Sequence, residues 1–355
     1  MTDDSAVISQ RQAIDAIHGG DPALIEMLFG PPLTVVADLL RGMICAPKGR
    51  QLYVADFAAI EARAVAWLAG QTDVLDVFRT GADIYKQQAG GIFGIPPATV
   101  DKDQRQIGKV AILALGYQGG VAAFQAMSKG YGLKIGAHYD AIWMAARTDH
   151  REAALKAWDE RGKRSGIAER TWKAAEVVKV AWRAANPRIV ALWRDLEDAA
   201  IAAVQQPGTT HAAGYIRFKK AGSFLWCQLP SGRTLCYPYP RVAMTTTPWG
   251  AERPQLLYWY TDQFTKQWGE GPTYGGSLAE NVTQAVARDI MADAMQRVDT
   301  AGYEVILTVH DEVVSETAAD FGSVDEFRAL MEVVPTWATG FPIAAEAWQG
   351  ARYRK

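Results

Sequence analysis

The sequence is poor in the residues that mark disulfide-rich and cysteine-metal proteins. It has three cysteines among 355 residues, Cys45, Cys227 and Cys236. Their spacing matches no metal-ligand motif, and their odd number favours reduced thiols, as in a cytoplasmic protein. No apolar run continues far enough without a charge to cross a bilayer. The polar, acidic start MTDDSAVISQ lacks the basic and apolar parts of a signal peptide. These absences predict a globular protein in the cytoplasm.

An overall excess of positive charge, which nucleic-acid binders commonly carry, is also absent. The formal net charge is -2, whereas contacts to phosphates need Lys and Arg. The charge is uneven, because residues 147–194 hold twelve Lys and Arg against six Asp and Glu. A local excess of this size is able to line a nucleic-acid channel. On charge alone, however, a solvated helical face is the favoured interpretation.

What is present is an ordinary globular balance of 49% hydrophobic and 21% charged residues, enough for a substantial core. Apolar periodicity and the Pro and Gly breaks predict the elements. The first fifty residues are expected to form helix and loop. Helix is expected over 58–69, 74–93, 104–115, 138–205 and 278–300, strand over 51–56, 303–309 and 312–315, and short strands and turns across 207–276. The expected elements therefore include both helices and short strands.

Two acidic residues stand at the ends of expected strands. Asp56 closes one strand, and Asp311 lies at the tip of a hairpin with apolar alternation, VILTVHDEVV. If both strands belong to one sheet, the two carboxylates meet at its edge, where a cation would offset their repulsion. Oxygen ligands suit Mg²⁺, and two such ions are able to activate an attacking oxygen and stabilise a leaving one. Either Asp taken alone is more simply a turn former.

Cationic residues share one face of the helix expected at 104–115. Arg105 and Lys109 are four residues apart, and Tyr117 lies just beyond the helix end. A guanidinium and an ammonium on one helical face are able to hold a triphosphate. Taken alone, the pair is more simply a solvated basic edge.

Together these residues resemble the motifs of family A DNA polymerases. Residues 56–63, DFAAIEAR, resemble the first palm motif D-Y-S-x-I-E-x-R, and Arg105, Lys109 and Tyr117 have the spacing of the fingers motif R-x3-K-x7-Y. Residues 309–312, VHDE, match the final palm motif, residues 280–289, ENVTQAVARD, resemble the helix that enters it, and residues 83–85, DIY, stand where D-I-H is common. The motifs follow in the family's order and cover nearly the whole chain. The stretches GKVAILALGYQGG and AWQGARYRK are similar to bacteriophage-encoded members.

The resemblance implies template-directed DNA synthesis, in which dNTPs are added to a primer 3′ end by two-metal phosphoryl transfer. The implied metal ligands for two Mg²⁺ ions, with Mn²⁺ as an alternative, are Asp56, Asp311 and the Phe57 carbonyl. The implied catalytic residues are Asp56, Asp311, Lys109 and Glu312, the nucleotide-binding residues are Arg105, Lys109, Glu61, Tyr117 and Tyr85, and the DNA-binding residues are Gln284, Arg288, His310, Arg41 and Asn281. In this scheme Lys109 protonates the leaving pyrophosphate and Glu61 disfavours a 2′-hydroxyl. The implied partners are primer-template DNA and dNTPs, in the host cytoplasm if the chain is phage-encoded.

The resemblance further implies an α+β fold with a right-hand architecture. Its palm would be an antiparallel sheet built from two separated stretches, before about residue 75 and after about residue 275, and its fingers would be mostly helical. Its expected parts are 1–75 for the N-terminal part of the palm, 76–275 for fingers with an insertion, and 276–355 for the C-terminal part of the palm. Two positions depart from the family pattern, because Leu113 replaces a usual aromatic and Gln106 a common second Arg. No thumb or exonuclease segment is found before the first motif. A separate chain that supplies both is an arrangement that the sequence leaves open.

Three alternatives are compatible with parts of the sequence. One is a polymerase-like subunit of a split enzyme, inactive or binding-only without an upstream partner chain. The missing thumb favours it, whereas the retention of Asp56, Lys109 and Asp311 argues against it. A single-subunit RNA polymerase conflicts with Glu61, since such an enzyme must admit a 2′-hydroxyl. A metal-dependent phosphohydrolase centred on His310 and Asp311 would need more histidines than the five in the chain offer.

Overall fold

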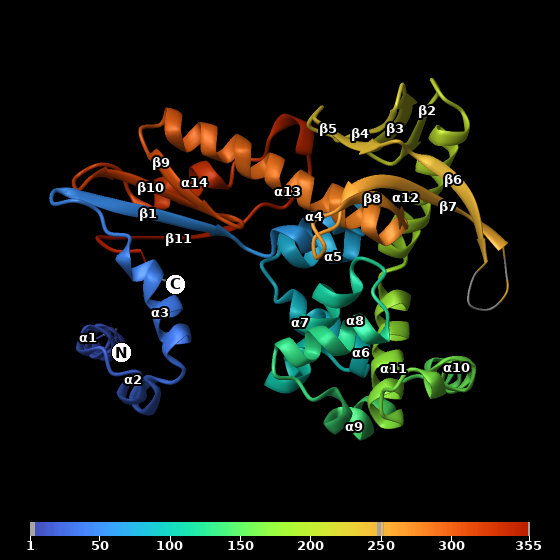
Figure 1. Cartoon of the computed structure of the whole chain (residues 1–355), viewed down its shortest axis with the longest axis horizontal. Coiled ribbons are helices and arrows are strands. Elements are labelled where there is room, and N and C mark those ends of the chain that lie inside the picture. The colour runs from blue at the N-terminus through green and yellow to red at the C-terminus, as the bar shows by residue number, and fades with distance from the viewer. Residues whose placement is uncertain (1–3, 247–249, 251, 354–355) are drawn as a thin grey trace. The chain divides into compact units, whose positions relative to one another are not determined.

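The computed structural model describes residues 4–246, 250 and 252–353 (Figure 1). The chain divides into two compact units, and each is described by itself. Unit 1 consists of Met1–Ala58, Met291–Val333 and Ala344–Lys355, and unit 2 of Ala59–Ile290 and Val334–Ile343. Both units are therefore assembled from segments that lie far apart in the sequence. The functional division expected near residues 75 and 276 stays a prediction.

Unit 1 is built on a four-stranded antiparallel sheet. The strands are β1 (Arg50–Phe57), β9 (Glu304–Val309), β10 (Glu312–Ala318) and β11 (Ala345–Gly350), in the order β11-β1-β10-β9. The sheet is covered on both faces, because the four central residues of β1 are all buried. Leu52 and Val54 pack with Val314 on one face. On the other face the Tyr53 ring meets Tyr303 edge-on at 5.0 Å. The expected antiparallel sheet and its strands are confirmed.

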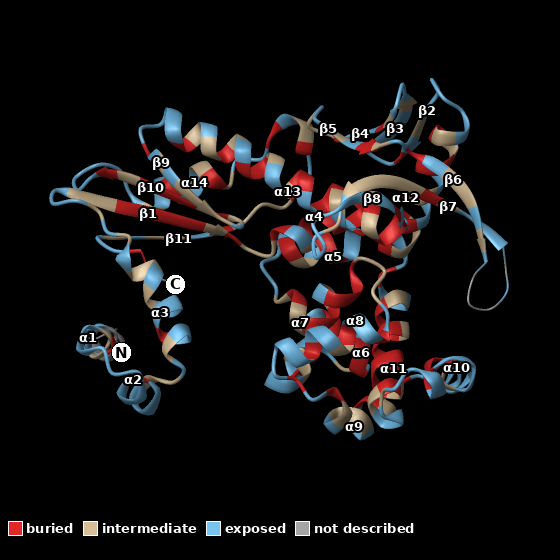
Figure 2. Cartoon of the chain, in the orientation of Figure 1, coloured by how far each residue is buried: buried red, intermediate tan, exposed pale blue. Residues whose placement is uncertain are grey.

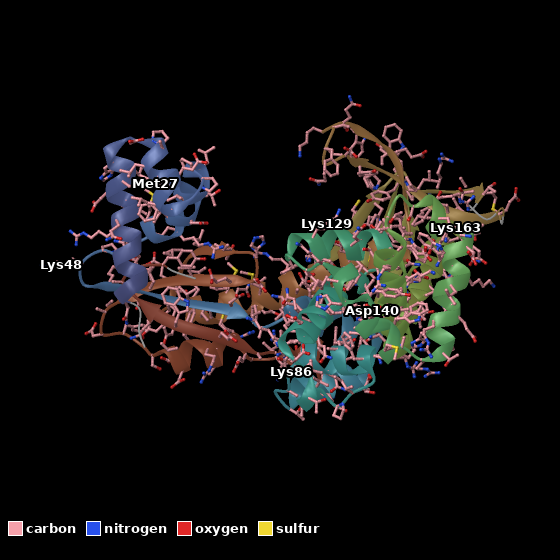
Figure 3. All side chains as sticks on the ribbon, turned by 90° about the horizontal axis from the view of Figure 1, so that it is seen from below. Met27, Lys48, Lys86, Lys129, Asp140 and Lys163 are labelled. Carbon is pink, nitrogen blue, oxygen red and sulfur yellow. The ribbon has the colours of Figure 1, made fainter. Side chains whose placement is uncertain are left out.

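Helices complete unit 1. They are α1 (Asp4–Gly19), α2 (Pro22–Phe29), α3 (Pro32–Leu40), the 3-10 turn η1 (Arg41–Met43) and α14 (Val324–Met331). The first three share a small buried cluster of Ala13, Ile25 and Val35. Large apolar side chains on α2 and α3 are exposed, including Met27, which Figure 3 labels. Within the described residues no single helix meets the length and hydropathy of a membrane span, although Pro22–Phe29 and Pro32–Met43, bent by 73°, meet them as a pair.

Unit 2 has a helical part. Its helices and 3-10 turns are α4 (Ile60–Ala69), α5 (Thr72–Arg79), α6 (Ile84–Phe93), η2 (Pro97–Thr99), α7 (Lys102–Leu115), α8 (Val121–Gly130), η3 (Ile135–His138), α9 (Tyr139–Ala145), α10 (Thr148–Glu160), η4 (Gly162–Arg164), α11 (Glu169–Ala185), α12 (Pro187–Gln205) and η5 (Thr336–Ala338). The single helix expected over 74–93 is wrong. The chain breaks at Thr80 and Gly81, where Gly81 has a left-handed φ of 69° that closes α5. Figure 2 shows α11 buried along much of its length.

Unit 2 also carries two antiparallel sheets, as the turn-rich pattern across 207–276 predicts. The first has the strands β2 (Thr210–Ala213), β3 (Ile216–Ala221), β4 (Phe224–Gln228) and β5 (Thr234–Pro238) in sequence order. The second has β6 (Arg241–Thr246), β7 (Glu252–Thr261) and β8 (Trp268–Thr273). Helix α13 (Gly275–Thr300) follows and belongs to unit 2 up to Ile290 and to unit 1 beyond it. Helices and antiparallel sheets together confirm the α+β class.

Candidate active site

The two acidic residues predicted as metal ligands lie at one edge of the unit 1 sheet. In the pairing of β1 with β10, Asp56 stands opposite Glu312. Asp311 precedes Glu312 in the turn between β9 and β10, and its carbonyl oxygen accepts a hydrogen bond of 3.2 Å from the Phe57 amide. The predicted ligands Asp56, Phe57 and Asp311 are therefore brought together by backbone pairing across 255 residues of sequence. Both Asp side chains are partly exposed.

The turn that presents Asp311 is tight and strained. Val309 pairs with Glu312, which leaves only His310 and Asp311 in the loop. His310 has a φ of 55°, in the left-handed region that a residue other than glycine occupies at a cost of about 1 kcal/mol or more. The exposed imidazole projects from this turn. Strain of this kind concentrates at functional sites, where it fixes a side chain that a relaxed turn would release.

Glu312 is held by the C-terminal end of the described chain. The Tyr353 hydroxyl donates a hydrogen bond to the Glu312 carboxylate, and both residues are buried. Burial and this hydrogen bond raise the pKa of Tyr353 to about 12, so the phenol remains a donor at neutral pH. The Arg41 guanidinium lies over the Tyr353 ring at 5.9 Å. Arg41, a predicted DNA contact, is thus placed beside the acidic edge of unit 1 through Tyr353.

The oxygen atoms at this edge suit Mg²⁺, which does not need protein ligands on every side. Within 4–246, 250 and 252–353 no three or more His, Cys, Asp or Glu side chains gather as a metal-holding group. Asp56 and Asp311 offer hard carboxylate oxygens, and Phe57 can add a carbonyl. Mg²⁺ is usually held by one or two carboxylates and completes its ligands with water and substrate phosphates. A sparse oxygen set is therefore what a nucleotide-dependent magnesium site requires.

In unit 2 the predicted cations lie around one aromatic ring. Arg105 and Lys109, on α7, approach the Tyr85 ring at 5.0 and 5.9 Å from its centroid. The Arg105 Nε donates a hydrogen bond of 2.6 Å to Asp83. Burial opposes ionisation of Asp83, but the bonds from Arg105 and from two backbone amides outweigh it and lower the pKa of Asp83. Lys109 also lies 5.1 Å from the Tyr131 ring. The two cations are therefore oriented before any ligand arrives.

Hydrogen bonds at the start of helix α7 and just beyond its end hold this helix in place. At its start Asp101 and Gln104 form a capping box, with the Gln104 amide donating to Asp101 at 2.8 Å and the Asp101 amide donating back at 3.1 Å. Just beyond its end, the Trp193 indole of α12 donates to the Gly116 carbonyl at 2.9 Å. These contacts fix the helix that carries Arg105 and Lys109.

Glu61 and Tyr117, predicted from separate motifs, are hydrogen-bonded in unit 2. The Tyr117 hydroxyl donates to the Glu61 carboxylate at 3.0 Å. Burial, followed by the charge of Glu61, raises the pKa of Tyr117 well above its usual value. Burial and the same charge raise the pKa of Glu280, at the start of α13. A fixed carboxylate next to a phenol offers a steric and polar boundary for a nucleotide sugar.

The predicted DNA contacts on α13 differ in exposure. Gln284 and Arg288 are exposed and lie four residues apart on one helical face. Asn281 is half-buried, and its amide donates a hydrogen bond of 3.1 Å to the Tyr237 hydroxyl. Gln284 and Arg288 are therefore accessible to a ligand, whereas Asn281 has a structural contact that ties α13 to β5.

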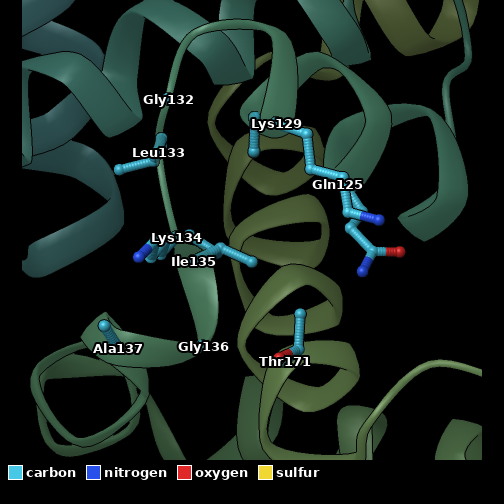
Figure 4. A pocket seen from close by; sticks show the side chains of 10 residues that line it. Gln125, Lys129, Gly132, Leu133, Lys134, Ile135, Gly136, Ala137 and Thr171 are labelled. Carbon is cyan, nitrogen blue, oxygen red and sulfur yellow. The ribbon is translucent and has the colours of Figure 1, made fainter.

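Unit 2 has a cavity of about 540 Å³. Figure 4 shows it between the end of α8, the η3 segment and α11, where Lys129, Lys134 and Thr171 contribute to its wall. None of the predicted site residues lines it. We therefore do not assign the nucleotide site to this cavity.

Comparison with known proteins finds similar sequences in one family of enzymes. The sequence model of "DNA polymerase family A" matches residues 32–130, which include Asp56, Arg105 and Lys109. A DNA polymerase of Bacillus phage SP02 is 36% identical over 345 residues, which is 97% of this chain and 47% of that protein. The chain is similar to members of DNA polymerase family A, and its resemblance to a phage member is confirmed. It spans about half the length of this phage relative.

Shorter matches extend the comparison. DNA polymerase I of Pseudomonas aeruginosa is 34% identical over 119 residues, 33% of this chain and 12% of that protein. The thermostable DNA polymerase I of Thermus aquaticus is 31% identical over 97 residues, 27% of this chain and 11% of that protein. The polymerase domain of Pol1 from M. smegmatis, solved with DNA primer-template and dNTP, has a TM-score of 0.49 at 15% identity, covering 88% of this chain and 42% of that one.

The sequence predicts no site role for three residues that contact the candidate site. Asp83 orients Arg105, Tyr131 lies against Lys109, and Tyr353 binds Glu312. Asp83 is visible in the sequence as part of DIY, but its ion pair with a residue 22 positions later is not. Nothing in the local sequence around Tyr131 or Tyr353 signals either contact, because each depends on tertiary packing.

Proposed function

We propose that this chain catalyses template-directed DNA synthesis, in which a primer 3′-hydroxyl attacks the α-phosphorus of a dNTP and pyrophosphate leaves. The observation that carries the proposal is the register of β1 with β10, which brings Asp56 and Asp311 to one sheet edge. The similarity to family A DNA polymerases supports it. The alternative of a binding-only subunit is less well supported, since Asp56, Lys109 and Asp311 are all present.

The acidic edge is the proposed metal site. Asp56, Asp311 and the Phe57 carbonyl would hold two Mg²⁺ ions, or Mn²⁺ in their place. Such ions supply positive charge that offsets the charge on the reacting phosphates. Glu312 and His310 would flank the primer end, with Glu312 kept in position by Tyr353.

The cationic face of α7 is the proposed triphosphate site. Arg105 and Lys109 would bind the phosphates, and the Tyr85 ring that both approach would help to orient them. Lys109 would donate a proton to the leaving pyrophosphate. Glu61, fixed by Tyr117, would exclude a 2′-hydroxyl from the incoming sugar.

Primer-template DNA is the proposed partner. Gln284 and Arg288 would touch it through the minor groove, where contacts test base-pair shape more than sequence. Arg41 and Asn281 are weaker candidates, because Arg41 lies over Tyr353 and Asn281 bonds to Tyr237. A separate chain with thumb and exonuclease, and the cytoplasmic location, stay predictions.

Primer extension by the purified chain with Mg²⁺ and dNTPs tests the proposal. We expect added nucleotides to follow the template sequence and Asp311→Asn to abolish extension. Asp320→Asn is the matched control, because it removes an equal charge from an exposed residue of the same unit. Extension that survives Asp311→Asn would rule out the proposed metal site.

A further inference from the structure

One segment of unit 2 is free of acidic residues. From Ala199 to Ala251 the sequence has five Lys and Arg and no Asp or Glu, in a chain whose formal net charge is -2. This segment includes the whole first sheet of unit 2, β2 to β5, and β6 of the second. Figure 1 shows the two sheets next to each other, and β5 packs against β7. Four of the five basic residues, Arg217, Lys219, Lys220 and Arg241, therefore lie on strands of these sheets.

A continuous series of aromatic rings crosses both sheets. We name Trp226, Phe224, Tyr239, Trp259 and Trp268 the aromatic ladder. Successive ring centroids are 5.5, 6.3, 6.5 and 6.2 Å apart. Trp226, Tyr239 and Trp268 are 37%, 55% and 53% exposed, and the other two are half-buried. Large aromatic side chains are seldom left in water in such a row unless they contact a ligand.

The ladder is not part of the core, because strand alternation separates it from the core residues. In β3 and β4 the side chains of Phe218, Leu225 and Cys227 are fully buried on the inner face. On the outer face Lys219 stands directly opposite Trp226. This outer face therefore combines a cation and an indole with no structural task in the core.

Two acidic groups that face basic residues of the acid-free segment are already neutralised. Arg233 forms an ion pair with Asp289, and Arg241 pairs with Glu270 through a hydrogen bond of 2.6 Å. A negatively charged ligand on the outer face is therefore not repelled by an uncompensated carboxylate at these positions. Charge and ring chemistry favour the same kind of ligand, an anionic chain that carries flat aromatic groups.

We propose that the aromatic ladder with Lys219 binds single-stranded DNA, of the kind that a template presents beyond the primer end. Exposed aromatic rings in a positively charged groove or surface stack on successive bases of single strands, and they tolerate any sequence because every base has a π-face. Duplex DNA is a poor ligand, since its bases are already stacked on one another. The site shares no residue with the proposed polymerase centre.

Fluorescence anisotropy of a labelled oligo(dT) with the full chain tests the site. The measurement uses EDTA and no dNTP, so its result is independent of the proposed catalysis. Each stacked base contributes roughly 5- to 150-fold in affinity, so we expect Trp226→Ala to raise the Kd about tenfold and Trp226→Phe to restore most of the binding. Lys219→Ala should weaken binding and reduce its salt dependence.

Matched controls and a second ligand make the test specific. Phe264→Ala removes a 95% exposed ring outside the ladder, and Lys156→Ala removes an exposed cation on α10; both should stay within about twofold of wild type. With primer-templates, Trp226→Ala should weaken binding when the template overhang is about 12 nucleotides and not when it is about two. Wild-type affinity of Trp226→Ala for oligo(dT), or an equal loss on both overhangs, would overturn the proposal.

Discussion

The contact of Tyr353 with Glu312 leads to a sharp prediction about both stability and activity. Tyr353→Phe removes one hydroxyl and keeps the ring, which stacks on Trp348 at 6.4 Å and lies under the Arg41 guanidinium. The substitution therefore isolates the hydrogen bond. Glu312 is 4% exposed, so water cannot readily replace the lost donor.

The size of the effect follows from this burial. A hydrogen bond to a charged group contributes about 1.5–3 kcal/mol, and a buried group left without its donor loses a comparable amount. We expect Tyr353→Phe to lower the free energy of unfolding of unit 1 by about 2 kcal/mol. Residues that orient a metal site from behind typically change activity 10- to 100-fold, so primer-extension kcat should fall about tenfold.

Urea unfolding and steady-state primer extension measure the two effects. Tyr215→Phe is the control, because it removes the same hydroxyl from a half-exposed tyrosine that stacks on Trp67. A double-mutant cycle with Glu312→Gln should show coupling between the two positions. Strict additivity in that cycle, or an unchanged urea midpoint for Tyr353→Phe, would refute the reasoning.

Two further predictions concern packing and pH. A Cβ at Gly108 would lie 2.2 Å from the Tyr85 carbonyl oxygen, so Gly108→Ala should lower the free energy of unfolding by about 1–3 kcal/mol and raise KM for dNTPs. Gly120→Ala is the control and should change neither, because a Cβ there would meet nothing within 4 Å. Urea unfolding and steady-state kinetics measure both variants. Burial and a 2.6 Å hydrogen bond to Glu326 raise the pKa of Tyr303 to about 12. Since an unfolded tyrosine ionises near pH 10, this stabilisation is complete below pH 10 and lost between about pH 10 and 12. Tyr303→Phe should unfold with a shallower pH slope there, and an unchanged slope in urea titrations would contradict this.

Local patterns in the sequence predict the elements that carry the site. The strand that carries Asp56 has a run of four apolar residues, Leu52 to Ala55, which suits a strand buried on both faces. The two-residue turn at His310 and Asp311 follows from alternation on either side. The helix with Arg105 follows from its capping residue Asp101. Short-range rules are enough for these elements because each depends on neighbouring residues.

Long-range contacts could not be predicted in the same way. The break between α5 and α6 at Gly81 was missed, because the apolar periodicity on the two sides is compatible with one helix. The pairing of Asp83 with Arg105 and of Tyr353 with Glu312 depends on how separate elements pack. Periodicity and spacing carry no information about such contacts. Arg105, Lys109 and Glu312 are therefore predicted without the residues that orient them.

The rate of single-dNTP incorporation by Asp56→Asn, compared with Asp320→Asn, tests the central claim most directly. Asparagine keeps the shape of the Asp56 side chain and removes its charge. It therefore cannot take the place of a carboxylate that acts together with Asp311 at the sheet edge. We predict a loss of about a thousandfold or more for Asp56→Asn, as for other groups that stabilise charge in a transition state, and a normal rate for Asp320→Asn. A rate for Asp56→Asn within tenfold of wild type would contradict the account.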